Sequence, residues 1–135
     1  MDIAQALGAT EPAGTYPIAI FIPSVDRDGV PIDQAYWINA ALVVLGRRFG
    51  GATAMPPGAG VWRDDDQGGE LKADASVMVF CLAQLSEVTP AALGDLRRFL
   101  HRMGRDAGQG EVGVVMEGQY FCIREYDAPE TEGSE

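Results

Sequence analysis

Apolar residues along this chain change their spacing several times, and each change predicts a boundary between a strand and a helix. Residues 16–25 (YPIAIFIPSV) are apolar on both faces of an extended chain, which is typical of a central strand. From Asp33 to Arg48 the apolar positions recur at three- and four-residue steps, which predicts a helix. Asp33 is expected to cap the first turn, and Gly50 and Gly51 are expected to end the helix.

The middle of the chain predicts two further strands. Residues 52–64 read as a second strand that starts at ATAM, is bent by PPGAG and resumes at VWRD. A polar DDQGG turn follows, and it leads into a third, apolar strand at residues 75–83 (ASVMVFCLA).

The last third of the chain predicts a second helix and a final extended segment. Thr89 has the position of an N-cap and Pro90 that of the first helical residue, and the apolar stripe runs to Met103. Gly104 is expected to lie near the end of this helix. Residues 111–125 form either one interrupted strand or two short strands joined by a tight turn at MEGQ.

The order of these elements predicts an α+β fold, a ferredoxin-like β-α-β-β-α-β sandwich. Its antiparallel sheet, in strand order 4-1-3-2, would carry two helices on one face, with an extra C-terminal strand as an option. We expect residues 1–15 to form an N-terminal arm, 16–126 a single ferredoxin-like domain, and 127–135 a disordered acidic tail.

Composition places this domain in the cytoplasm. The 135 residues are 47% hydrophobic, enough for one real core, but no apolar run reaches the roughly 18 residues that a membrane span needs. The N-terminus lacks the basic start and apolar stretch of a secretory signal. Cys81 and Cys122 lie in apolar, strand-like runs, so both are expected to be free and largely buried, with strand one between them.

Charge divides the chain into acidic and basic parts. Twenty acidic residues against ten basic ones give a net charge of −10, which disfavours direct binding to nucleic acids. The second helix nevertheless gathers basic side chains over about half of its circumference: Arg97, Arg98, His101, Arg102 and Arg105. Three interpretations stay open for this surface: an ordinary solvated helix face, a docking surface for an acidic protein or ligand, or a partner for the chain's own acidic tail.

No residue is nominated for catalysis, for a cofactor or for a metal. The glycine-rich GGATAMPPGAG segment lacks the G-K-[ST] sequence of a phosphate-binding loop and follows a helix instead of a strand. Asp64, Asp66 and Glu70 could supply oxygen ligands to a divalent cation, but solvated turn charges are the simpler interpretation. His101 is expected at the surface without an orienting acid. Trp62 either packs in the core or at an edge, or forms the floor of a pocket.

Two short motifs resemble a group of small uncharacterised bacterial proteins. The motifs are FGGAT at residues 49–53 and G-x-W at residues 60–62, followed by a polar turn and an apolar strand. The resemblance implies a bacterial origin and the ferredoxin-like order of elements. It carries no assigned activity.

The expected fold leads to three functional hypotheses. Two helices cover only one sheet face, so the other would expose apolar side chains unless a second copy covered it. We therefore expect a non-enzymatic interaction module that forms a homodimer through its sheet. The alternative is a small-molecule-binding or enzymatic protein of the dimeric α+β barrel type, with a pocket between the open sheet face and the Trp62 hairpin. A third hypothesis is an acidic mimic of nucleic acid.

Overall fold

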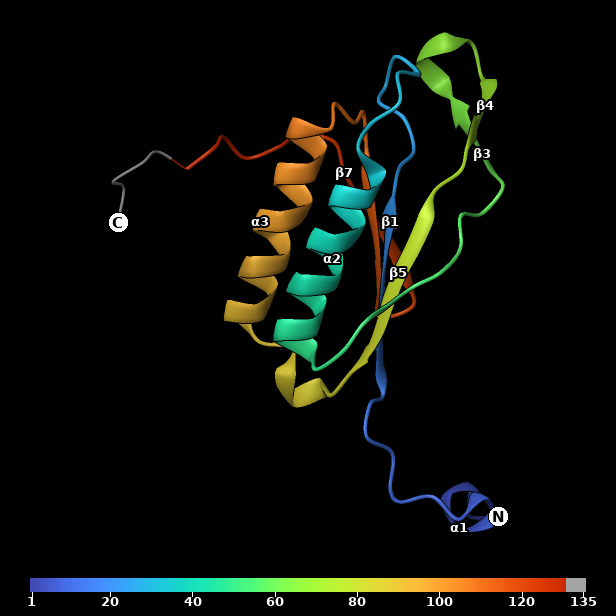
Figure 1. Ribbon diagram of the computed structural model, residues 1–135, viewed down its shortest axis with the longest axis vertical. Helices are drawn as coiled ribbons and strands as arrows, with labels where there is room; N and C mark the ends of the chain where they lie inside the picture. Colours follow the sequence, from blue (N-terminus) through green and yellow to red (C-terminus); the bar gives the residue numbers. More distant parts are fainter. Residues whose placement is uncertain (131–135) are drawn as a thin grey trace.

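The computed structural model describes residues 1–130, and residues 131–135 lie outside the described part. Two long helices and a sheet form the body, while a short N-terminal helix stands apart from it (Figure 1). The helices are α1 (Ile3–Leu7), α2 (Gln34–Phe49) and α3 (Pro90–Asp106), with single-turn 3-10 helices at η1 (Asp65–Gln67) and η2 (Leu85–Glu87). The strands are β1 (Tyr16–Ile22), β2 (Thr53–Ala54), β3 (Gly60–Asp64), β4 (Glu70–Asp74), β5 (Val77–Ala83), β6 (Val112–Met116) and β7 (Gln119–Ile123).

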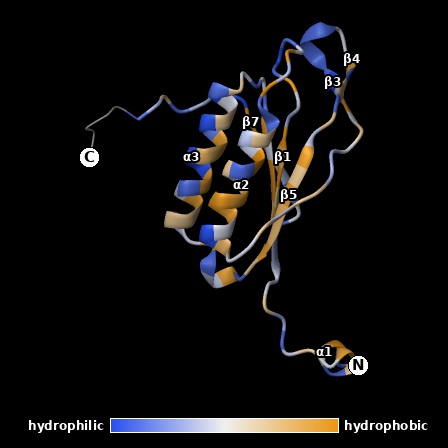
Figure 2. Cartoon of the chain, viewed as in Figure 1, coloured by the Kyte–Doolittle hydropathy of each residue, from blue (hydrophilic) through white to orange (hydrophobic). Residues whose placement is uncertain are grey.

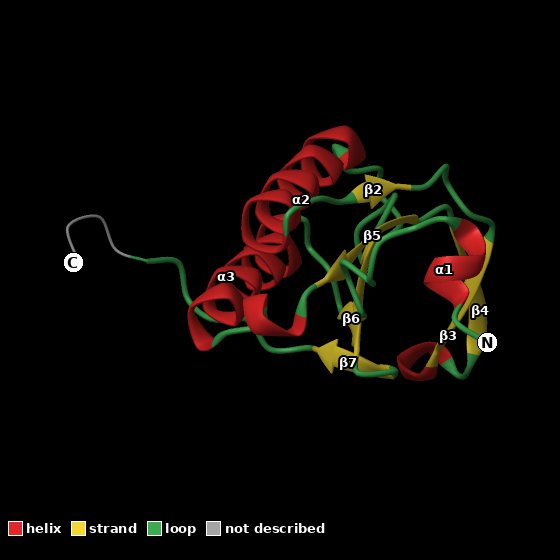
Figure 3. Ribbon diagram, turned by 90° about the horizontal axis from the view of Figure 1, so that it is seen from below, coloured by secondary structure: helices red, strands yellow, loops and turns green. Residues whose placement is uncertain are grey.

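The main sheet is antiparallel and has the order β2-β5-β1-β6-β7. This order confirms the predicted arrangement of the first four strands and the option of an extra C-terminal strand at the edge. Helices α2 and α3 cover one face of the sheet (Figure 3). The α+β architecture and the placement of the two helices are therefore as the periodicity predicted.

The core lies between this sheet face and the two helices. Alternate residues of the central strands point into it, and Ile18, Ile20 and Ile22 of β1 are completely buried. Their neighbours across the ladder are also buried, for example Val79 of β5 opposite Ile20. Both helices bury apolar residues in this core, for example Leu45 of α2 and Leu96 of α3, and hydrophobic and hydrophilic stretches alternate along them (Figure 2).

The helix ends follow local capping chemistry. The Asp33 side chain accepts a hydrogen bond from the Tyr36 backbone N–H, and the Thr89 side chain accepts one from the Ala92 N–H. Gly50 ends α2 in a left-handed conformation with φ 89°, as expected of a C-cap glycine. The expectation that Gly104 lies near the end of α3 holds only loosely, because the helix continues to Asp106.

The predicted second strand is only partly correct. Just Thr53 and Ala54 join the main sheet, and the VWRD sequence leaves it to form β3. Strand β3 pairs with β4, which the sequence did not predict, in a separate hairpin with Trp62 opposite Lys72. Two consecutive prolines precede this departure, and proline lacks the N–H that continued sheet pairing needs.

The final segment consists of two strands. Glu117 and Gly118 both have positive φ, at 54° and 70°, which is the conformation of the tightest hairpin turns. Because this turn reverses the chain after Met116, β7 becomes the outermost strand of the sheet.

The two cysteines differ in exposure. Both are free, but only Cys81 is buried; Cys122 is exposed, so the prediction that both are buried is wrong. Cys122 lies on the edge strand β7 and pairs with Gly113, whose side of the sheet faces away from the helices. Two strands, β1 and β6, separate β5 from β7.

The chain ends lie outside the core. Helix α1 has no buried residue, and it is held away from the body by an extended linker (Figure 1). The acidic tail was predicted to be disordered from residue 127, but Asp127 is hydrogen-bonded to helix α3. The rest of that prediction falls largely on residues 131–135, outside the described part. Within residues 1–130 no helix is long and apolar enough to cross a membrane.

Candidate functional site

The sheet face opposite the helices is rich in apolar and aromatic side chains. Residues paired across a ladder share a face, so Phe21 and Met78 lie together on this side, as do Ala19 and Phe80. Leu82 and Tyr120 are more than half exposed here. In the described structure the open face includes Ala19, Phe21, Met78, Phe80, Leu82, Val115 and Tyr120.

Two projections flank the open face. The β3–β4 hairpin and α1 both lie on this side of the sheet, opposite the helices (Figure 3), and at opposite ends of the long axis (Figure 1). The hairpin is tied to the segment that follows β1, because the Ser24 hydroxyl donates a 2.7 Å hydrogen bond to Asp74. It exposes Val61, Trp62 and Leu71, which adds apolar surface beside the sheet. A face of this kind is typical of a binding surface.

Trp62, the predicted pocket residue, therefore lies outside the core. It is 46% exposed, on the strand of the hairpin that the sequence had assigned to the main sheet. Trp62 therefore does not pack in the core. It lies on the hairpin that flanks the open face.

A polar group lies at one edge of the open face. The Tyr120 hydroxyl donates to Glu111 over 3.3 Å, and the Arg124 guanidinium donates to the other Glu111 oxygen over 3.0 Å. The Tyr120 ring packs against Phe21, with 6.4 Å between the ring centroids. It also covers Gly113, where any Cβ would overlap the phenol. Glycine at position 113 is therefore what lets the ring lie flat against the sheet.

The protonation states of this group follow from its surroundings. Partial burial, and then the charge of Glu111, raise the pKa of Tyr120 to about 12, so the phenol is a neutral hydrogen-bond donor at neutral pH. Desolvation, with Glu111 next, also raises the pKa of Cys122. Its thiol stays protonated and is a weak nucleophile. The group can therefore bind and orient a ligand, with Glu111 as its source of negative charge.

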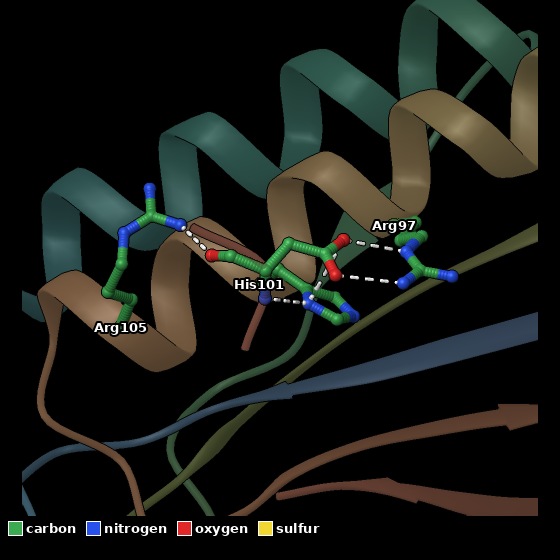
Figure 4. Close-up of polar contacts among 4 residues, drawn as sticks. Arg97, His101 and Arg105 are labelled. Atoms are coloured by element: carbon green, nitrogen blue, oxygen red, sulfur yellow. Dashed lines mark hydrogen bonds and ion pairs between the residues drawn. The ribbon is translucent and has the colours of Figure 1, made fainter. Parts of the chain in front are cut away.

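The predicted basic surface on α3 is divided into two parts. Arg97, His101 and Arg105 all contact Asp127 of the C-terminal segment (Figure 4). Arg97 makes two hydrogen bonds to the Asp127 carboxylate, at 2.7 and 2.8 Å, and Arg105 donates to its backbone carbonyl at 2.6 Å. The pKa of Asp127 is lowered, chiefly by the hydrogen bond from Arg97.

His101 is buried, so the expectation of a surface histidine is wrong. Its Nδ1 accepts a 2.8 Å hydrogen bond from the Asp127 backbone N–H, which requires that nitrogen to be unprotonated. The Tyr126 ring lies edge-on to the imidazole and fills the space that a side chain at position 104 would need. The C-terminal segment folding back over α3 is what buries His101, and helix periodicity alone does not show it.

The other two arginines face helix α2. Arg98 and Arg48 of α2 both pair with Asp95, whose pKa these hydrogen bonds lower. The Arg102 guanidinium lies 4.8 Å from the centroid of the Trp37 ring and donates a 2.7 Å hydrogen bond to the Tyr36 hydroxyl. The five predicted docking residues thus belong to two neighbouring surfaces.

Carboxylates of the acidic turn at residues 64–70 bond to other groups of the same hairpin. Asp64 accepts from the Asp66 N–H at 3.2 Å, and Glu70 pairs with Lys72 at 3.2 Å. Among residues 1–130, no group of three histidine, cysteine, aspartate or glutamate side chains is placed to hold a metal ion.

Comparison with known proteins gives a match by structure and none by sequence. No protein-family model matches the chain, and no curated protein does. The fold is similar to that of a phage SAM lyase in complex with S-methyl-5'-thioadenosine, with a TM-score of 0.61, 15% identity, and coverage of 84% of this chain and 92% of that one. The apo state of a phage SAM lyase gives a TM-score of 0.56 at 15% identity, over 89% and 97% of the two chains. At this identity the likeness is one of fold.

These comparisons correct two sequence-based interpretations. The resemblance to a bacterial group through FGGAT and G-x-W is wrong: the first motif is a helix end and the second lies in the separate hairpin, so neither defines the fold. The interpretation as a non-enzymatic interaction module is also wrong, because the fold is shared with an enzyme over most of both chains. The absence of a catalytic motif in the sequence was not a sound reason to exclude enzymes.

The residues at the edge of the open face were missed by the sequence analysis. Glu111 precedes β6, and Tyr120 and Arg124 belong to or follow β7, so they look like ordinary strand and turn residues. The one available signal was Gly113 within an apolar strand, because an internal glycine marks a close approach of another group.

Proposed function

We propose that this protein is an S-adenosylmethionine-binding enzyme whose ferredoxin-like core presents the open sheet face as the ligand site. The observation that carries the proposal is the aromatic pair Phe21 and Tyr120 beside the Glu111 carboxylate, on an otherwise apolar surface. The shared fold with a phage SAM lyase supports the ligand class.

The chemistry of this surface suits that ligand. S-adenosylmethionine combines an adenine ring, which stacks on aromatic side chains, with a positively charged sulfonium centre. Aromatic faces attract cations through their negative π surface, and a carboxylate such as Glu111 adds direct charge attraction. The net charge of −10 also favours the approach of a cation over that of an anion.

Lyase activity is the reaction class we propose for the bound ligand. The product to expect is S-methyl-5'-thioadenosine, which leaves when the bond from the sulfonium sulfur to the γ-carbon of the amino-acid part breaks and its electron pair stays on sulfur. The ligand's own carboxylate oxygen bonds that carbon in the same step, so the amino-acid part leaves as a lactone. Tyr120 and Glu111 would hold and orient the ligand. Trp62 would border the site from the hairpin.

A second copy of the chain would complete the site. The open face, the hairpin and α1 each expose apolar side chains, for example Leu82, Trp62 and Leu7, and exposed apolar surface of this kind is often covered in an interface. We therefore propose a homo-oligomer in which the open faces are covered, with the ligand enclosed at the contact. The two free cysteines agree with a cytoplasmic location for this assembly.

Binding of S-adenosylmethionine to the full chain, measured by isothermal titration calorimetry, tests the proposal. Glu111→Gln removes the negative charge with little change of shape, and we expect at least about a tenfold loss of affinity. Glu125→Gln is the matched control, because it makes the same charge change at an exposed residue with no hydrogen bond or ion pair within residues 1–130.

The readout of the reaction is kept separate from that of binding. Release of S-methyl-5'-thioadenosine is followed by liquid chromatography over hours at saturating ligand. Binding without release would remove the lyase assignment and leave the binding site. No binding by the parent chain, or an equal loss in Glu111→Gln and Glu125→Gln, would refute the site itself.

A further inference from the structure

We propose that the groove between α2 and α3 is a second binding surface, which takes an acidic segment of a partner protein. The groove lies on the layer opposite the open sheet face and has a volume of about 1050 Å³. Its floor is apolar, formed by Ala40, Val43 and Val44 of α2 and Phe99 of α3. Val43 is half exposed, so the floor is accessible from solvent.

Arginines line both walls of this groove. Arg47 and Arg48 come from the last turn of α2, and Arg98, Arg102 and Arg105 come from α3. Together with Arg97, six of the ten basic residues of the chain lie on these two helices. A protein with twenty acidic residues thus concentrates its positive charge on one surface.

The charge of the groove is only partly neutralised. Asp95 is shared between Arg48 and Arg98, so one carboxylate serves two guanidinium groups. Within residues 1–130, Arg47 and Arg102 make no ion pair with a carboxylate. In all, five arginines line the groove against the three carboxylates of Asp95, Asp127 and Glu130, so positive charge is left over for an external anion.

The guanidinium of Arg102 is already fixed in position for such a contact. Its guanidinium stacks on Trp37 and donates one hydrogen bond to the Tyr36 hydroxyl. Stacking fixes the plane of the group and leaves its other N–H donors able to bind a carboxylate. A fixed arginine loses less conformational entropy on binding than a free one.

Charge complementarity selects an acidic peptide over a nucleic acid. The chain as a whole has a net charge of −10, which repels a long polyanion that extends beyond the groove. A peptide with a few carboxylates and apolar residues can pair with the arginines and cover the floor. Asp127 of this chain, which also lines the groove, is already bound by Arg97 and Arg105.

The test uses a fluorescein-labelled hexaglutamate peptide and the full chain, with binding followed by fluorescence anisotropy. We expect saturable binding that weakens as salt rises, because the contacts are ionic. Arg47→Gln combined with Arg102→Gln should weaken binding at least about tenfold. Arg63→Gln is the control: it removes the same charge type from the hairpin, where Arg63 pairs with Asp65.

Three kinds of result would overturn the proposal. The first is no binding by the parent chain, or equal losses in the groove variant and in Arg63→Gln. The second is tighter binding of a single-stranded oligonucleotide than of the peptide, which would favour nucleic acid. The third is peptide binding only after deletion of residues 131–135, which would make the chain's own tail the occupant. Circular dichroism of each variant establishes that it is folded.

Discussion

The open sheet face and the outer helix face are the two large surfaces of this molecule, and they are built in opposite ways. The helix face is charged, and several of its arginines pair with nearby carboxylates, as in the contacts of Arg97 with Asp127 and of Arg48 with Asp95. The sheet face is apolar, and its side chains come from four strands, of which only β6 and β7 follow one another directly in sequence. A charged face is already solvated, whereas an apolar face gains from being covered.

Within the sheet, the residues that stabilise the fold are different from those that are available for binding. Each central strand contributes one set of alternate residues to the core and the other set to the open face. The first set is completely buried and holds the fold together. The second set is partly exposed, so much of its apolar surface remains for binding a ligand or a second copy.

Adjacent residues of β1 give the sharpest test of this separation. Ile20 is fully buried, and Ile20→Ala should lower the free energy of unfolding by about 2–5 kcal/mol through lost burial and a cavity. Phe21 lies on the open face, so Phe21→Ala should cost less stability and should weaken S-adenosylmethionine binding. Urea unfolding and calorimetric titration measure the two effects. Equal stability losses, with binding intact in Phe21→Ala, would show that the open face is only structural.

Substitutions at the end of α2 test whether this helix ends because of the backbone conformation of Gly50. Gly50 has φ 89°, so Gly50→Val forces a branched side chain into a left-handed conformation at a cost of about 1–2 kcal/mol. The neighbouring Gly51 does not have positive φ and has open space around it, so Gly51→Val is the matched control with a smaller effect. Thermal unfolding without ligand compares them. Loss of ligand binding at unchanged stability would instead indicate a ligand loop at these glycines.

The smallest effect is expected at the outer helix face, where Asp127→Asn removes an exposed ion pair. Because the pKa of Asp127 is lowered in the folded state, its stabilisation is present above the unfolded-state value of about 3.9 and is lost as the pH falls through the folded-state value. The parent chain should therefore unfold at a higher temperature than Asp127→Asn at neutral pH, and the difference should shrink in acid. Asp66→Asn is the control. A difference that does not depend on pH would mean that the charge of Asp127 is unimportant.

The sequence by itself determined the elements whose signals are local. Asp33, Gly50 and Thr89 act through bonds to residues within one helical turn, so their types and spacing were enough to place α2 and α3. Alternation in the apolar strands and the order of the elements gave the strand order of the main sheet, because few connections satisfy that order. The clustering of arginines on α3 also follows from helical periodicity alone.

Only the tertiary structure decided which side chains are buried and which lie together on one surface. His101 became buried because Tyr126 and Asp127 fold back onto α3, and Glu111 met Tyr120 because the β6–β7 turn brings them to one edge of the sheet. Strand β3 lies outside the main sheet, although its sequence reads as the continuation of the second strand. In each case the deciding partner is distant along the chain or on another strand. Such contacts depend on register and on the return path of the chain, which no local pattern of residues encodes.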